Sequence, residues 1–283
     1  MHRIGAHTST SKSLEQAVVT AHELGGNCCQ IFSGSPRTWR NPMPKADAVR
    51  AMKVTRKNLD VNPVVIHANY LINLASMEPG IRGNSIAAFR GELERAAAIG
   101  ADYLVLHPGS FKGQSVAEAI ACFLDNMTAA AEGVAADGLT ILLENTAGAG
   151  SILGSKLEEL AVMGDELRGR ISIPVGYCLD TCHLLASGYD VATAEGLEET
   201  VVQADATVGL RNVPVIHTND SKTPLGSRRD RHEHIGKGFV GLEAFGRIVN
   251  HAKLRDKAFI LETPEDDDGG HAENMVVLKR LIT

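Results

Sequence analysis

The sequence predicts a (β/α)8 TIM barrel of the α/β class, and three observations indicate this fold. Short apolar segments rich in β-branched residues alternate with amphipathic segments along the whole chain. Eight such alternations in 283 residues match the number of units and the length of a (β/α)8 barrel. No long polar linker interrupts them, so residues 1–283 are expected to form a single domain.

A doubly wound parallel sheet is the alternative arrangement of the same elements. That fold favours a glycine-rich turn after its first strand. The segment Gly5-Ala6-His7-Thr8, which follows the first apolar run, does not supply such a turn. The barrel is therefore preferred.

The expected strands are apolar runs, and several are continuous, as in strands buried on both faces of a sheet. The run Ile141-Leu142-Leu143 is one example. In chain order, strands are predicted over residues 3–7, 28–33, 64–68, 103–107, 140–146, 175–180, 215–219 and 258–263.

The expected helices are amphipathic segments bounded by local signals. Ser13 and Ser115 can cap the helices that follow them, and Gly25 and Gly100 stand where helices should end. In chain order, helices are predicted over residues 12–25, 45–60, 84–99, 115–136, 155–169, 193–207, 241–254 and 272–282.

Two connections are longer than a tight turn requires. Residues 69–83 follow the third predicted strand, and residues 220–240 follow the seventh. In this fold the loops after the strands form the active-site face, and long loops in compact domains are usually functional. Both loops are therefore expected to border a functional site.

The amino-acid composition limits the classes of protein to which the chain can belong. Hydrophobic residues make up 44% of the chain, which is enough for one large core. No apolar run approaches the roughly 18 residues of a membrane span, and the first residues begin a strand, so a cytoplasmic protein without a membrane partner is expected. The five cysteines are odd in number and form no C-x-x-C pair, which favours reduced thiols.

Metal-ligand residue types recur at the carboxyl ends of the predicted strands. Since these ends meet at one rim of a barrel, the side chains are expected to lie together. From the third strand to the eighth they are His67, His107, Glu144, Asp180 with His183 three residues later, His217 and Glu262.

The long loop after the seventh strand adds Asp230 and His232, a carboxylate and an imidazole two residues apart. Five imidazoles and four carboxylates suit zinc, with manganese or iron as alternatives. At roughly three protein ligands per catalytic ion, this set would hold two or three ions. Clustered divalent ions are typical of phosphoryl transfer.

The net charge of −6 at first disfavours a nucleic-acid partner, because such proteins usually carry a basic face. Divalent ions bound at the predicted rim would offset this charge and place positive charge at the mouth of the barrel. The acidic composition therefore does not exclude a polyanionic substrate.

Four motifs carry a resemblance to a known family: LENTAG at 143–148, CLDTCH at 178–183, HTNDSK at 217–222 and DRHEHIG at 230–236. In these motifs, in order on the predicted fold, the chain resembles the endonuclease IV family of zinc-dependent apurinic/apyrimidinic endonucleases. The resemblance extends from Ile4 to Pro264. Phe111, Ala149 and His234 depart from the family pattern, but none of these departures removes a ligand.

The resemblance implies three zinc ions per chain, with manganese as an alternative at one or more sites. Glu144 would be shared by the first two ions and is the expected catalytic residue. The implied ligand sets are His67, His107 and Glu144; Glu144, Asp180, His217 and Glu262; and His183, Asp230 and His232. The side chains implied to penetrate DNA are Arg37, Tyr70 and Leu71.

The implied activity is hydrolysis of the phosphodiester on the 5′ side of an abasic site, which leaves a 3′-hydroxyl and a 5′-deoxyribose phosphate. Double-stranded DNA with abasic sites or blocked 3′ ends would be the substrate, and a monomer is expected. A metal-dependent barrel isomerase or epimerase acting on a sugar is the first alternative. A catalytically silent DNA-binding module is the second, and the complete ligand set argues against it.

Overall fold

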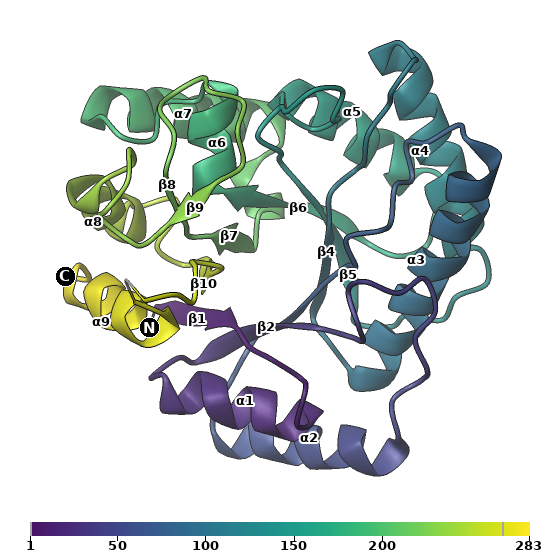
Figure 1. Cartoon of the computed structure of the whole chain (residues 1–283), viewed down its shortest axis with the longest axis horizontal. Helices are drawn as coiled ribbons and strands as arrows, with labels where there is room; N and C mark the ends of the chain where they lie inside the picture. Colours follow the sequence, from purple (N-terminus) through teal and green to yellow (C-terminus); the bar gives the residue numbers. More distant parts are fainter. Residues whose placement is uncertain (1, 268) are drawn as a thin grey trace.

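Eight parallel strands close into a barrel, and helices surround it (Figure 1). The computed structural model describes residues 2–267 and 269–283. Around the barrel the strands follow the order β1-β10-β7-β6-β5-β4-β3-β2. The predicted fold class is confirmed, and the doubly wound alternative is excluded because β1 pairs with both β2 and β10.

All eight predicted barrel strands form, and several end one or two residues earlier than predicted because the last residues leave the sheet. Their bounds are β1 Arg3–His7, β2 Cys28–Phe32, β3 Val64–His67, β4 Tyr103–Leu106, β5 Thr140–Glu144, β6 Val175–Asp180, β7 Val215–His217 and β10 Ala258–Leu261.

The eight predicted helices also form. Their bounds are α1 Leu14–Glu23, α2 Ala46–Asn58, α3 Pro79–Ile99, α4 Val116–Ala131, α5 Leu157–Arg168, α7 Ala194–Thr207, α8 Leu242–Asn250 and α9 His271–Arg280. The third helix starts five residues before its predicted start at residue 84. Pro79 occupies its first turn, and the Glu78 carboxylate accepts hydrogen bonds from the amides of Gly80 and Ile81. This cap shortens the loop predicted over residues 69–83.

Four short elements were not predicted. Helix α6, Thr181–Ser187, follows β6 directly, and the one-turn helix η1 covers Leu210–Asn212. Strands β8, Asp220–Ser221, and β9, His232–Glu233, pair antiparallel within the loop after β7. Strands β8 and β9 together form an ordered hairpin within the long loop, beside the barrel mouth.

Two apolar layers hold the barrel. The larger lies between strands and helices and includes Ile31, Ile66, Leu104 and Ile141. The smaller fills the barrel interior with inward-facing residues, namely Cys28, Val65, Val105, Leu142, Cys178, Val215, Ala258 and Ile260. Because successive side chains on a strand point to opposite faces, this interior layer fixes which later residues also point inward.

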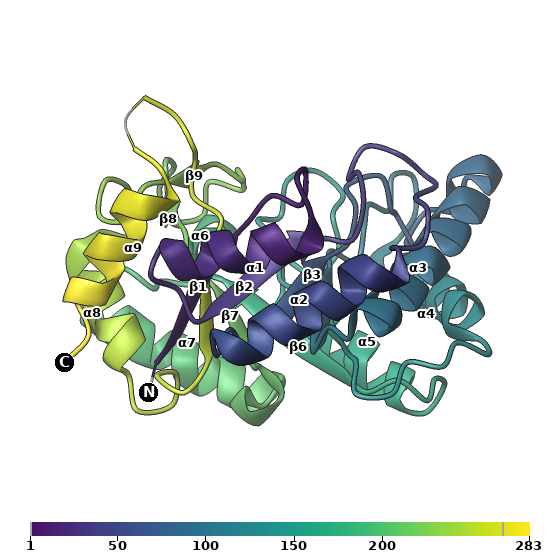
Figure 2. The ribbon, with the colours of Figure 1, turned by 90° about the horizontal axis from the view of Figure 1, so that it is seen from below.

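The loops that follow the strands gather on one side of the barrel, the upper side in Figure 2, and the N-terminus lies on the opposite side. All five cysteines carry free thiols, as predicted. In the described parts of the chain, no helix combines the length and apolar character needed to cross a membrane.

Candidate metal centre

The alternation of side chains along the strands brings the predicted ligands together. Val65, Leu142 and Val215 point into the barrel, so the residues two positions later point inward one layer nearer the loops. Those residues are His67, Glu144 and His217. The same spacing of two residues relates Val105 to His107, Cys178 to Asp180 and Ile260 to Glu262.

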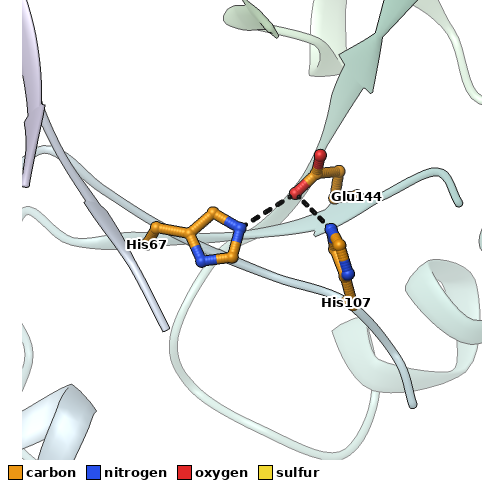
Figure 3. A group of neighbouring side chains, drawn as sticks. All are labelled: His67, His107 and Glu144. Atoms are coloured by element: carbon orange, nitrogen blue, oxygen red, sulfur yellow. Dashed lines mark hydrogen bonds and ion pairs between the residues drawn. The ribbon is translucent and has the colours of Figure 1, made fainter. Parts of the chain in front are cut away.

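Glu144 lies at the centre of this layer and is completely buried. Its Oε2 atom lies 3.3 Å from Nε2 of His67 and 3.0 Å from Nε2 of His107, so two imidazoles converge on one oxygen (Figure 3). Its Oε1 atom lies 3.0 Å from Nδ1 of His217. Each oxygen of this carboxylate therefore faces a different group of side chains.

The second group surrounds His217. Nδ1 of this imidazole lies 3.0 Å from Glu144 and 3.2 Å from Oε2 of Glu262. Asp180 completes the group, and the four ligand atoms lie within 4.8 Å of one another. Three carboxylates and an imidazole at this spacing can hold a divalent ion.

The third group combines α6 with the loop hairpin. Nε2 of His183 lies 3.2 Å from Oδ2 of Asp230, and Nε2 of His232 lies 3.3 Å from Oδ1 of the same carboxylate. His183 reaches this place because Asp180 caps α6 by accepting a hydrogen bond of 2.8 Å from the His183 amide. The structure thus brings all nine predicted ligand residues into three groups.

Three of the five histidines of these groups are oriented by backbone carbonyls. Nδ1 of His67 lies 2.7 Å from the carbonyl of Ala68, and Nδ1 of His183 lies 2.9 Å from the carbonyl of Asn145. His232 contacts the carbonyl of Glu262 in the same way, at 3.1 Å. Since a carbonyl only accepts, each of these Nδ1 atoms donates to it, and Nε2 is the ring nitrogen that can bind a metal.

The Nε2 atoms of His183 and His232 are buried and form no hydrogen bond with acceptable geometry. A buried ring nitrogen without a hydrogen-bond partner is costly unless it binds a cation. Oriented imidazoles and ionised carboxylates are the ligands that zinc takes. The residues of the centre therefore fit divalent metal ions.

Glu144 and Asp230 are ionised well below neutral pH. Burial alone would raise the pKa of Glu144, but the imidazoles of His107 and His217 outweigh it and hold that pKa well below its usual value. The pKa of Asp230 is lowered to about 2, because interaction with His183 exceeds the opposing effect of burial.

Two imidazoles show the complementary shift. Burial alone would lower the pKa of His183, but the carboxylates of Asp180 and Asp230 raise it well above 6.5. The pKa of His217 is also raised well above 6.5 against the effect of burial, by Cys178, Glu262 and Glu144. In the metal-free protein these imidazoles are protonated, and a bound cation would take the place of the protons.

Two side chains that sequence reasoning missed contact the ligands. Oε1 of Gln30 lies 2.7 Å from Nε2 of His217, and Nε2 of Gln30 donates to Glu262 at 2.5 Å. Nδ1 of His7 lies 3.1 Å from Gln30. Gln30 stands two residues after the interior residue Cys28, so the alternation that selects the ligands could also have selected Gln30.

Asp180 is fixed by two buried amides. The side chain of Asn145 accepts a hydrogen bond from the Asp180 amide at 2.6 Å. The side chain of Asn219 donates to Oδ2 of Asp180 at 2.6 Å and accepts from the amide of Glu262 at 2.8 Å. These contacts join β5, β6, β7 and β10 immediately beneath the metal groups.

A cavity of about 400 Å³ opens above the groups and is lined by His67, His107 and Tyr70 among others. Tyr70 stands at its rim as a residue that is 68% exposed, and its ring centroid lies 5.2 Å from that of Phe32. The Tyr70 amide donates to the carbonyl of Pro36, which places exposed Arg37 in the adjoining loop. Leu71, the next residue, is half-buried.

Comparison with known proteins decides the family. A family model described as a xylose isomerase-like TIM barrel matches residues 18–281. A probable endonuclease 4 of Solibacter usitatus is 53% identical over 99% of this chain and 96% of its own length. The chain belongs to the endonuclease IV family.

Other members agree over the full length. A probable endonuclease 4 of Haloarcula marismortui is 36% identical over 99% of both chains. The crystal structure of endonuclease IV from Thermus thermophilus matches with a TM-score of 0.86 and 38% identity, over 99% of this chain and 98% of that one. A D-tagatose 3-epimerase-like protein shares the fold, with a TM-score of 0.68 at 19% identity over 98% of this chain and 96% of that one.

Proposed function

We propose that this member of the endonuclease IV family is a DNA-repair hydrolase that cleaves double-stranded DNA on the 5′ side of abasic sites. The products are a 3′-hydroxyl and a 5′-deoxyribose phosphate. The observation that carries the proposal is the position of Glu144, whose two oxygens face two adjacent groups of ligands. Divalent ions held by two such adjacent groups would be suited to hydrolysis of a phosphodiester.

Three zinc ions per chain are part of this proposal, with manganese as an alternative at one or more sites. Nitrogen and carboxylate oxygen donors favour zinc or manganese over softer metals. The thiol of Cys182 also lies near Asp180 and His232. Burial and the charge of Asp180 raise the pKa of Cys182 to about 12, so this thiol keeps its proton in the metal-free protein.

Bound divalent ions supply Lewis-acid chemistry, since they lower the pKa of water and neutralise the charge of the departing oxygen. The protein supplies the geometry. Glu144 is completely buried and is held on both oxygens, so its carboxylate can orient the attacking water towards phosphorus. Water adds to phosphorus, and the bond to the 3′ oxygen of the preceding nucleotide breaks.

Lesion recognition is assigned to the rim. An abasic nucleotide has no base to unstack, so rotating it out of the duplex costs less than rotating an intact one. Arg37, Tyr70 and Leu71 would fill the space that it leaves and stabilise a bent duplex. The exposure of Tyr70 and Arg37 beside the cavity supports this assignment.

Phosphate contacts are assigned to basic side chains of the same face, because such contacts position DNA without reading its sequence. The candidates are Arg37, Arg40, Lys222, Arg228, Arg229 and Arg231. Blocked 3′ ends are proposed as a second substrate, since the same phosphate position is attacked. One chain carries the complete ligand set, so a monomer would suffice for activity. The proposed location is the cytoplasm.

The test is incubation with a duplex that carries a single abasic site, without added magnesium. The expected product is a strand cut on the 5′ side of the lesion whose 3′ end a DNA polymerase can extend. A ketose with the same preparation serves as the second substrate. Turnover of the ketose, with the abasic strand left intact, would favour a sugar isomerase and overturn the proposal.

A further inference from the structure

Asp220 has a buried carboxylate that belongs to none of the three metal groups. It lies in β8, shortly after the barrel strand that carries His217, and is completely buried. A buried carboxylate is costly unless its oxygens are fully hydrogen-bonded. Its partners therefore indicate what it holds in place.

Those partners are mainly backbone amides of one loop segment. Oδ2 accepts hydrogen bonds from the amides of Gly236 at 2.9 Å and Gly238 at 3.1 Å. Oδ1 accepts from the amide of Val240 at 2.8 Å and from that of Ser221 at 2.7 Å. The amide of Gly241, which precedes α8, lies within 3.5 Å of both oxygens. Residues 236–241 thus fold around a single side chain.

The glycines of residues 236–241 give this segment a backbone conformation that allows close contact with the Asp220 carboxylate. A Cβ atom on Gly238 would lie 2.3 Å from the carbonyl oxygen of Ser221 and 2.5 Å from Oδ1 of Asp220. Gly236 and Gly241 adopt positive φ angles of 81° and 83°, which favour glycine. The glycines allow the amides to approach the carboxylate closely.

The anchored segment directly follows two metal-ligand residues. Asp230 and His232 come from the loop hairpin, whereas the other seven ligand residues come from the barrel strands, from the residues that directly follow them, or from α6. Ser221 pairs with His232, and Asp220 pairs with Glu233. Asp220 therefore fixes the hairpin through its backbone and residues 236–241 through its carboxylate.

We propose that Asp220 is a positioning residue for the third metal group: by holding the hairpin and residues 236–241 together, it keeps Asp230 and His232 opposite His183. This inference rests on the proposed function for its three metal groups. A carboxylate is required because both oxygens accept from N–H donors, and an amide would turn its own N–H groups towards them. Its charge also suits the N-terminal end of α8.

The test compares Asp220→Asn with Asp230→Asn by metal content at limiting zinc and by amide hydrogen exchange. Asp220→Asn is expected to weaken binding of the third ion by about 10- to 100-fold, to keep about two ions, and to exchange faster over residues 236–241. Asp230→Asn should lose the same ion but keep the slow exchange of residues 236–241. Normal affinity for the third ion in Asp220→Asn would overturn the inference.

If Asp220→Asn does not fold, Gly238→Ala tests the same arrangement, because its Cβ would clash with the carbonyl oxygen of Ser221 and with Oδ1 of Asp220 and so push residues 236–241 away from β8. It should lose the third ion selectively, and full retention of that ion would overturn the inference. A different result would contradict the proposed function. A loaded wild-type protein that leaves abasic DNA intact would contradict the function, even where the third ion depends on Asp220.

Discussion

Oε1 of Gln30 lies 2.7 Å from Nε2 of His217, and this contact determines which nitrogen of the imidazole faces the metal groups. Nε2 of Gln30 donates to Glu262, so Oε1 is oriented to accept a hydrogen bond from Nε2–H of His217. Nδ1 of His217 is then left to face Glu144 and Glu262. Gln30 therefore orients a ligand from the opposite side of the barrel interior.

Replacement of Gln30 by leucine removes this acceptor while keeping a side chain of similar size. Zinc affinity is expected to fall by about 10- to 100-fold, as for other partners of metal-bound histidines. Competition with a zinc-binding dye measures it. Ile31→Val trims the opposite face of the same strand and should leave zinc affinity unchanged; equal losses in both variants would show that Gln30 only packs.

Replacement of Glu144 by glutamine should abolish strand cleavage without unfolding the protein. An amide of the same shape cannot supply negative charge to two groups, so the rate is expected to fall by at least about 100-fold. Rates on an abasic duplex measure the loss, and circular dichroism checks the fold. Exposed Glu23→Gln is the control. A Glu144→Gln enzyme with near-normal activity would remove Glu144 from the centre of the mechanism.

Zinc binding to the metal-free protein should release protons near neutral pH. The pKa values of His183 and His217 are raised above 6.5, so these imidazoles hold protons at pH values where an ordinary histidine has lost them. Zinc binds only the neutral form, and its apparent affinity should therefore rise with pH. Titration calorimetry in buffers of different ionisation enthalpy counts the protons. A heat that does not depend on the buffer would contradict this expectation.

Replacement of Tyr70 by alanine should weaken the preference for abasic over intact duplex by roughly tenfold, because the ring no longer fills the gap at the lesion. Its exposure means that stability should change little. Binding to matched duplexes measures the preference. Tyr70→Phe keeps the ring and should keep the preference, and an unchanged ratio in the alanine variant would rule out the wedge role.

A buried ion pair links the third helix to the end of the second barrel strand. Nη2 of Arg95 lies 3.0 Å from Oε1 of Glu92, and both side chains contact the hydroxyl of Ser33. Glu92→Gln leaves the Arg95 charge without a counterion, which should cost about 3 to 5 kcal/mol of unfolding free energy. Denaturant titration of the metal-free protein tests this. Exposed Glu94→Gln should stay within about 0.5 kcal/mol of wild type.

The strands and the ligand positions could be predicted because both depend on one local rule. Continuous apolar runs mark strands buried on both faces, and the residue that ends each run points into the barrel mouth. His67 and His217 illustrate this, since each follows an interior valine by two residues. Such a pattern requires no knowledge of distant contacts.

The unpredicted features depend on contacts between distant parts of the chain or on very short elements. Helix α6 has only seven residues and is capped by the Asp180 carboxylate. The β8–β9 hairpin contains two residues per strand and is held by the buried Asp220. Gln30 acquires its role from His217, which lies 187 positions away. The α6 cap and the hairpin leave no periodic signal in the sequence, whereas Gln30 follows the inward-facing alternation of its strand and only its partner, His217, is distant.

The most direct test of the proposed mechanism is stepwise reconstitution of the metal-free protein with zinc, with incision of a single-abasic-site duplex followed at each addition. Incision on the 5′ side of the lesion is expected to rise with added zinc and to level off near about three equivalents per chain. Protein that has bound this amount of zinc and still leaves the abasic strand intact would contradict the mechanism.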